Sequence, residues 1–200
     1  GKEVLAFILV PAGHAGANKE LLHNLELPYQ AVTSTDLYLT HYLNDSANDP
    51  VMNRIRAQKL RNSEEDKVKI FFVPSYLNGD DGVFNMPYYD LLVGMDLTAF
   101  PSYYEPWGYT PLESLAFKVP TITTTLAGFG LWVKEHYNMN HPGIEVIHRE
   151  DGDASNVATA IAEWVKNYTQ VGETEMQKDR DNAKDVSRIA LWDNLINYYK

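Results

Sequence analysis

Strand-like and helix-like segments alternate along this chain, and that alternation limits its fold more than any other feature. The run VLAFILV at 4–10 is almost continuously apolar and too short for an ordinary helix, so it predicts a strand over Glu3–Val10. Similar runs predict strands at 67–73, 96–100, 120–125 and 143–148. Strands that alternate with helices are typical of a parallel sheet covered on both faces. We therefore predict an α/β protein with a Rossmann-like parallel sheet.

Helical periodicity and end signals predict the intervening helices. Asn48 and Asp49 followed by Pro50 have the pattern of a helix start. Ser155 reads as the N-cap of a helix through Tyr168, which has a regular apolar stripe. Further helices are predicted at 88–95, 110–118, 131–138 and 189–199. The segments PAGHAGAN (11–18) and AGFG (127–130) predict loops by their Gly content, and 31–39 indicates a further strand.

Length and composition exclude several classes of protein. A chain of 200 residues suits one domain over 1–200 with its own hydrophobic core. The net charge of −10 argues against a nucleic-acid-binding surface, which needs clustered cations. No apolar run approaches the ~20 residues that span a bilayer, so no membrane partner is expected. The chain contains no cysteine, which fits a reducing compartment, and we expect a cytoplasmic location.

The segment FPSYYEPWGYTPLE (100–113) carries the most informative chemistry. It begins where a predicted strand ends, and ligands of open α/β sheets bind beyond the carboxyl ends of strands. Thr110, Pro111 and Glu113 have the spacing of a capping box, with Thr110 as N-cap. The free N–H groups and partial positive charge of such a helix start can hold a phosphate.

Side chains around this helix start would suit a nucleotide ligand. Gly108 lets a ligand approach the backbone, and Trp107 and Tyr109 offer aromatic faces. Glu105 and Glu113, eight positions apart, are placed to grip two parts of one ligand. The same residues also fit a plain capped helix that follows an aromatic-rich turn. The residue pattern alone leaves both interpretations open and assigns no reaction.

Other candidate sites are weaker. The histidines lack a zinc-ligand spacing, so no metal is predicted. His14 is a candidate to line a cleft, although a plain loop position is favoured. Asp80-Asp81-Gly82 reads as a turn rather than a calcium loop. Ser102 has no G-x-S-x-G context and is not predicted to be a nucleophile.

The segment EPWGYTPLE resembles the E-x7-E motif of retaining glycosyltransferases that are built from two facing Rossmann-like domains, the GT-B architecture. More narrowly, FILVPA, NDPVMNRIRAQKLRN, DKVKIFFVPSYLN and the block 88–130 resemble the eukaryotic-type glycogen synthases in the same order. The resemblance runs from about Val4 to Asp151 and more loosely to Trp192. It implies that the chain is the C-terminal, donor-binding half of such an enzyme.

The resemblance also implies roles for single residues. The donor is expected to be UDP-glucose, transferred with retention to an α-1,4-glucan, and no cofactor or metal is implied. Glu105 would face the sugar hydroxyls at the reacting centre and act as the catalytic carboxylate. The nucleotide sugar would be bound by the following residues: Tyr88 stacking on the uracil, Glu113 on the ribose, Tyr109 and Thr110 on the diphosphate, with Trp107 and Gly108 in the same turn.

The chain also departs from the resembled family. The family's Arg and Lys that neutralise the diphosphate lie upstream of the strand matching Glu3–Val10, and the acceptor-binding domain precedes them. We therefore expect the 200-residue chain alone to be inactive and to bind UDP weakly at most. In KDRDNAKDVSR (178–188) acidic residues interrupt the family's Arg-rich helix, so activation by a sugar phosphate is not expected.

Three functional hypotheses remain: this donor-binding half, a non-catalytic nucleotide- or carbohydrate-binding module, and a retaining enzyme that makes another glucoside. The stretch 189–199 is a candidate crossover helix to the other domain. Its aromatic face would then be partly exposed, so a second copy of the chain is a candidate partner.

Overall fold

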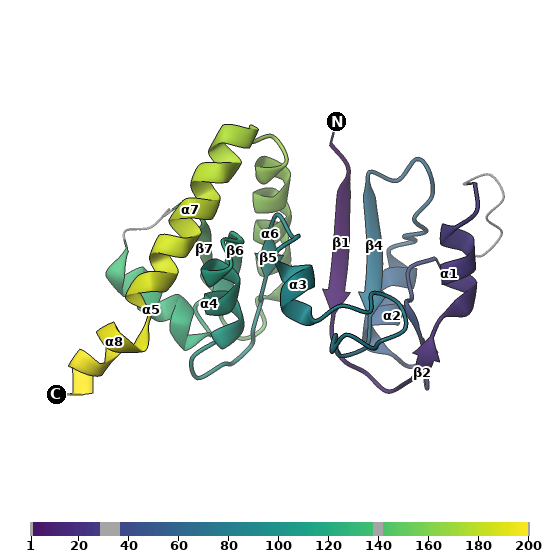
Figure 1. The fold of residues 1–200 in the computed structure, drawn as a ribbon, viewed down its shortest axis with the longest axis horizontal. Coiled ribbons are helices and arrows are strands. Elements are labelled where there is room, and N and C mark those ends of the chain that lie inside the picture. The colour runs from purple at the N-terminus through teal and green to yellow at the C-terminus, as the bar shows by residue number, and fades with distance from the viewer. Residues whose placement is uncertain (1, 29–36, 138–141, 200) are drawn as a thin grey trace. The chain divides into compact units, whose positions relative to one another are not determined.

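The computed structural model describes residues 2–28, 37–137 and 142–199. The chain forms two compact units, Gly1–Tyr88 and Tyr89–Lys200, and each is described by itself (Figure 1). The expectation of a single domain over 1–200 stays a prediction.

A two-stranded parallel sheet forms the centre of the first unit. The elements of this unit are β1 (Val4–Leu9), β2 (His14–Ala17), α1 (Lys19–Leu25), β3 (His41–Leu43), α2 (Pro50–Ala57) and β4 (Val68–Val73). β1 and β4 pair in parallel with Val4 opposite Val68, whereas β2 and β3 pair antiparallel. Met52 and Ile55 of α2 pack with Phe72 of β4 in the buried core of this unit.

The predicted strand at Glu3–Val10 and the helix start at Asp49–Pro50 are confirmed as β1 and α2. Asp49 caps α2 by accepting a 2.8 Å hydrogen bond from the Met52 N–H, and Pro50 takes the first position. The prediction of a plain loop at 11–18 is wrong, because His14–Ala17 forms β2. Its partner β3 lies more than twenty residues away, so no local pattern reveals the pairing. The strand predicted at 31–39 falls mostly outside the described residues.

The second unit contains a three-stranded parallel sheet in the order β5–β6–β7. Its strands are β5 (Thr98–Ala99), β6 (Thr121–Thr124) and β7 (Ile144–Ile147). Its helices are α4 (Tyr109–Ala116), α5 (Gly128–His136), α6 (Ala154–Tyr168), α7 (Glu173–Ile189) and α8 (Trp192–Leu195), followed by the 3-10 helix η2 (Ile196–Tyr199). The short helix α3 (Tyr88–Leu92) includes the boundary between the units.

Helices cover both faces of this second sheet (Figure 1). Ile144 of β7 packs with buried side chains of α4, α5 and α7. Ile122 and Ile147 face the other way and pack against Val157 of α6. Neighbouring residues of a strand point to opposite faces, so each strand contributes to both cores. The predicted α/β class, with a parallel sheet between two helical layers, is confirmed here.

Several predicted helix ends in this unit are wrong. The AGFG segment is not a turn but the start of α5. Its glycines fit tightly, because a Cβ at Gly128 or Gly130 would meet the backbone carbonyl oxygen of Pro106 or of Thr124. Helix α6 begins one residue before Ser155, with Asp153 at the N-cap position.

The predicted continuous helix 189–199 is interrupted: α7 ends at Ile189, and α8 and η2 follow after a break. Helix α7 itself was missed because it is very polar, and its buried residues are only Ala183, Val186 and Ser187. The expected exposure near this end is found, since Trp192 is 62% exposed.

Candidate functional site

The segment between β5 and α4 is anchored to the sheet by hydrogen bonds. The Phe100 N–H donates to the Ile122 carbonyl at 2.8 Å, and the Thr124 hydroxyl donates to the Ser102 carbonyl at 3.0 Å. The Glu105 N–H donates to the Leu126 carbonyl at 3.0 Å. The segment therefore follows the carboxyl edge of β6, where ligands of parallel sheets bind.

Glu105 is half-buried, and its carboxylate lies beside the start of α4. The Ser102 hydroxyl donates to Glu105 Oε2 at 3.1 Å. A Cβ built on Gly108 would lie 3.5 Å from the same oxygen. Since Gly108 is the residue before α4, this places a negative charge next to the first turn of that helix.

Helix α4 begins without a side-chain cap. Gly108 is its N-cap, with φ 105° and ψ 78°, a conformation that favours glycine. The predicted capping box is wrong, because Thr110 and Pro111 are the second and third residues of the helix rather than its N-cap and first residue. Pro111 is tolerated there because first-turn N–H groups have no partner within the helix.

The aromatic residues predicted for the site divide into exposed and packed side chains. Tyr109 is 68% exposed, and Thr110 is also exposed at the helix start. Trp107 packs against the core, edge-on to Phe129 at 5.6 Å and to Trp132 at 6.0 Å between ring centroids. Its ring therefore supports the turn from inside the unit.

Glu113 is held by an aromatic neighbour. Tyr89 stacks on Phe117, with ring centroids 5.1 Å apart. The hydrogen bond that Tyr89 donates to Glu113, together with the charge of that carboxylate, raises the pKa of the Tyr89 phenol. A carboxylate has two oxygens, so Glu113 can accept from Tyr89 and still accept from a ligand hydroxyl.

The last predicted site residue, Tyr88, closes the first unit. Its N–H donates to the Leu77 carbonyl at 2.9 Å. Glu105 and α4 belong to the second unit. The structure thus brings together Glu105, Gly108, Tyr109, Thr110 and Glu113 around the start of one helix, with Trp107 packed behind them.

The N-terminus of α5 is closed by the same segment that leads into α4. The Gly128 N–H donates to the Glu105 carbonyl at 3.0 Å, and the Phe129 N–H donates to the Trp107 carbonyl at 2.6 Å. These contacts fix the backbone on both sides of Pro106. The carboxylate of Glu105 is therefore carried on a main chain that is itself held by a helix start.

Sequence reasoning missed Arg149 and gave Ser102 no role other than a rejected nucleophile. Arg149 follows β7 and is 4% exposed, and its guanidinium lies 3.6 Å from the centre of the Tyr103 ring. Nη1 of Arg149 donates to the Pro101 carbonyl. Its position just after a predicted strand was the available signal, because residues there share the sheet edge with Glu105.

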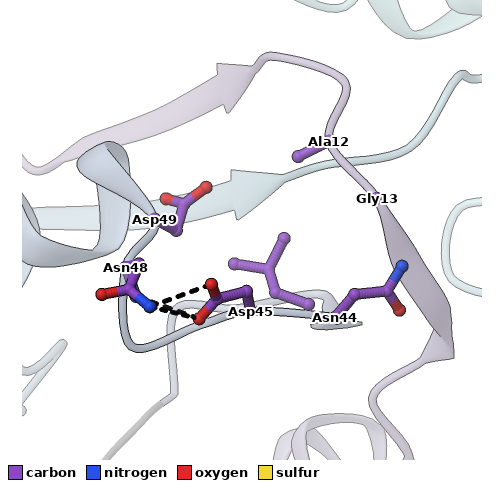
Figure 2. A pocket seen from close by; sticks show the side chains of 7 residues that line it. Ala12, Gly13, Asn44, Asp45, Asn48 and Asp49 are labelled. Carbon is purple, nitrogen blue, oxygen red and sulfur yellow. Dashed lines mark hydrogen bonds between the residues drawn. The ribbon is translucent and has the colours of Figure 1, made fainter.

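The first unit contains a small open pocket with a volume of about 330 Å³ (Figure 2). Ala12 and Gly13 line one side, and the side chain of Asn48 points toward the Asp45 carboxylate on the other. Asn48 donates to both Asp45 oxygens, and Asp49 caps α2, so these polar groups already have partners. The pocket is therefore a weaker candidate than the start of α4.

His14 and His41 form an edge-on pair in the same unit, with ring centroids 4.7 Å apart. Burial and the neighbouring His41 lower the pKa of His14. His41 Nε2 lies 2.8 Å from the Asp81 carbonyl, which ties β3 to the turn at 80–82. Within the described ranges, no group of three metal-ligating side chains is found, and no helix is long and apolar enough to cross a bilayer.

Parallel strands that alternate with helices define this chain as a Rossmann-like α/β protein. A family model described as glycogen synthase matches residues 19–200. The chain therefore belongs to the glycogen synthase family, a family of glycosyltransferases.

The similar proteins include glycogen [starch] synthase isoform 1 of Saccharomyces cerevisiae, 31% identical over 81% of this chain and 23% of its own length. The glycogen [starch] synthase of Caenorhabditis elegans is 35% identical over 77% of this chain and 23% of its own length. The liver glycogen [starch] synthase of Mus musculus is 31% identical over 80% of this chain and 23% of its own length. The chain thus spans less than a quarter of these relatives.

Among solved structures, a glycosyltransferase from Rickettsia africae ESF-5 matches with a TM-score of 0.42 and 22% identity. The match covers 92% of this chain and 42% of that one.

Proposed function

We propose that this chain is the donor-binding half of a retaining glycosyltransferase that transfers glucose from UDP-glucose to the end of an α-1,4-glucan. One observation carries the proposal: the Glu105 carboxylate lies beside the start of α4, which has Gly108 at its N-cap and no side-chain cap. A helix start of this kind attracts an anion, and a carboxylate next to it suits a hydroxyl-rich group. A nucleotide sugar combines both chemistries.

In the proposed reaction, the diphosphate rests against the first N–H groups of α4, at Tyr109 and Thr110. The leaving UDP gains negative charge as the glycosidic bond breaks, and donors already in place stabilise that charge. Glu105 orients the sugar hydroxyls and stabilises positive charge that develops at the anomeric carbon. Glu113 would accept from the ribose hydroxyls with its second oxygen, and Tyr88 would stack on the uracil.

The other parts of the reaction are also proposals. No metal is required if backbone N–H groups and basic side chains elsewhere in the complete protein neutralise the diphosphate. We propose that the acceptor is an α-glucan, bound by a part of the complete protein outside this chain. The proposed location is the cytoplasm. With a net charge of −10, the chain is not proposed to bind nucleic acid.

The test uses the complete protein in which this sequence occurs, with labelled UDP-glucose or ADP-glucose as donor and glycogen as acceptor. We expect transfer from UDP-glucose with retained anomeric configuration, read by NMR of the product. The 200-residue chain alone should transfer nothing and bind UDP weakly at most. UDP binding by the complete protein without transfer to any glucan would support a binding module instead and contradict the proposal.

A further inference from the structure

Arg149 is a buried cation near the end of β7. It is 4% exposed, and within the described part of the chain no carboxylate lies at ion-pair distance from it. Its Nε is buried without a hydrogen-bond partner. Burying an unpaired charge is unfavourable, so this arrangement is a poor way to gain stability.

The backbone of Arg149 is fixed from both sides by one threonine. The Arg149 N–H donates to Thr125 Oγ1 at 2.9 Å, and the Thr125 hydroxyl lies 3.3 Å from the Arg149 carbonyl as a donor. Thr125 directly follows β6. The main chain of Arg149, from which the guanidinium extends, is therefore anchored to the end of the neighbouring strand.

The guanidinium reaches the two residues that flank Ser102. It donates to the Pro101 carbonyl, and its central carbon Cζ lies over the Tyr103 ring, 3.6 Å from the ring centre. Ser102 in turn donates its hydroxyl to Glu105 Oε2 at 3.1 Å. Residues 101–104 have no regular secondary structure, so contacts of this kind decide their conformation.

We propose that Arg149 is a positioning residue for the transfer reaction. It holds residues 101–104 so that Ser102 keeps its hydroxyl on Glu105 and the carboxylate stays beside α4. The inference rests on the proposed function for its kinetic consequence, whereas the holding of the loop is independent of it. A lysine cannot replace the arginine fully, because an ammonium is a point charge and lacks the planar guanidinium that can stack on an aromatic ring.

The kinetic test compares Arg149→Met, Arg149→Lys, Tyr103→Leu and Tyr103→Phe in the complete protein, with Arg188→Met as the control. Arg188 is exposed on α7 and pairs with Asp185, so the same substitution there should change nothing. Arg149→Met should lower kcat about 10- to 100-fold while KM for the donor changes little, since a misplaced catalytic group costs rate rather than binding. Arg149→Lys and Tyr103→Leu should lie between, and Tyr103→Phe should retain activity because it keeps the ring.

Hydrogen exchange supplies a readout that does not depend on activity. In Arg149→Met the amides of Ser102 and Glu105 should exchange faster, whereas those of β6 keep their protection. If Arg149→Met fails to fold, Tyr103→Leu decides, because its side chain is 62% exposed. Unchanged kcat in Tyr103→Leu and Arg149→Lys, or unchanged exchange at 102–105, would overturn the inference. A wild-type protein without transfer activity would overturn the proposed function. The hydrogen-exchange result would still test whether Arg149 holds residues 101–104 in place.

Discussion

Helices α4 and α5 follow neighbouring parallel strands and begin at the same edge of the sheet. Their starts differ in how the N–H groups of the first turn are bound. At α5, the Gly128 and Phe129 N–H groups donate to the carbonyls of Glu105 and Trp107. At α4, Gly108 precedes the helix without a side-chain cap, and Tyr109 in the first turn is 68% exposed.

This difference shows how one segment can bind the first-turn N–H groups of one helix (its closed end) and lead into another helix that has no side-chain cap (its open end). First-turn N–H groups lack partners within a helix and bind a backbone carbonyl, water or a ligand. Residues 105–107 supply the carbonyls at α5 and then lead directly into α4. The closed end thereby fixes the position of Glu105 relative to the open end, where we propose that the diphosphate binds.

The largest effect on turnover is expected at Glu105, which contacts the starts of both α4 and α5. Glu105→Gln keeps the backbone carbonyl that closes α5 but removes the charge beside α4. In the complete protein we expect kcat to fall about 100-fold, as for other electrostatic groups at reacting centres. The free energy of unfolding should change by less than about 1 kcal/mol, because an amide oxygen can still accept from Ser102.

The matched control is Glu135→Gln on the exposed side of α5, which should leave both turnover and unfolding unchanged. Turnover measurements and urea unfolding separate the two effects. Near-normal kcat in Glu105→Gln would contradict the assigned role of the carboxylate.

The closed end can be broken by adding a single methyl group. In Gly128→Ala the new Cβ would collide with the Pro106 carbonyl, which belongs to the main chain and cannot turn away. We expect a loss of about 2–4 kcal/mol in the free energy of unfolding, as for other overpacked sites. Because the collision displaces residues 105–107, the tryptophan fluorescence of the folded protein should also change.

Gly172→Ala is the comparison for this variant, because nothing lies within 4 Å of a Cβ built at Gly172. That change should cost less than about 1 kcal/mol. Equal stability of the two variants in urea unfolding would show that the contact between the start of α5 and residues 105–107 (the α5 seam) can accommodate a methyl group.

The smallest effect concerns the ionisation of Tyr89 beside the open helix. Glu113 accepts the phenol hydrogen bond and raises the pKa of Tyr89, so the folded state favours the neutral phenol. This contribution is complete below pH ~10, the ordinary value of a tyrosine, and is lost as the pH rises through the raised pKa. Glu113→Gln should move the pKa of Tyr89 back toward its ordinary value.

A spectrophotometric titration near 295 nm would measure this shift. Subtracting the curve of the Tyr89→Phe variant isolates Tyr89 among the thirteen tyrosines. Glu163→Gln on the exposed side of α6 serves as the control. An unchanged titration in Glu113→Gln would show that the two side chains do not interact in solution.

The strands could be predicted, and a candidate site could be proposed, because both depend on local pattern. The apolar runs place β1, β4, β6 and β7 within about two residues of their observed ends. The segment after β5 was proposed as the candidate site because strand ends in parallel sheets converge on one edge, and its ligand stays a prediction. Neither inference needs knowledge of contacts between distant residues.

Features set by distant contacts escaped prediction. Thr110-Pro111 has the local pattern of an N-cap and first residue, but α4 starts earlier, after Gly108 turns at φ 105°. A Cβ at Gly108 would lie within 3.6 Å of the Ala127 side chain, nineteen positions along the chain. The hydrogen bond of Arg149 to Pro101 joins residues 48 positions apart. Periodicity within a window of one helix or strand contains no trace of either contact.

The two hydrogen bonds of the α5 seam join main-chain donors of α5 to main-chain acceptors of residues 105–107. Every amino acid carries the same carbonyl, so substitutions at the exposed position 106 should leave the two hydrogen bonds intact, provided that the backbone keeps its path. Position 128 has the opposite property, since only a hydrogen atom fits where a side chain would begin. A deep mutational scan of the complete protein should therefore find a permissive position and an invariant one on opposite sides of the same pair of hydrogen bonds.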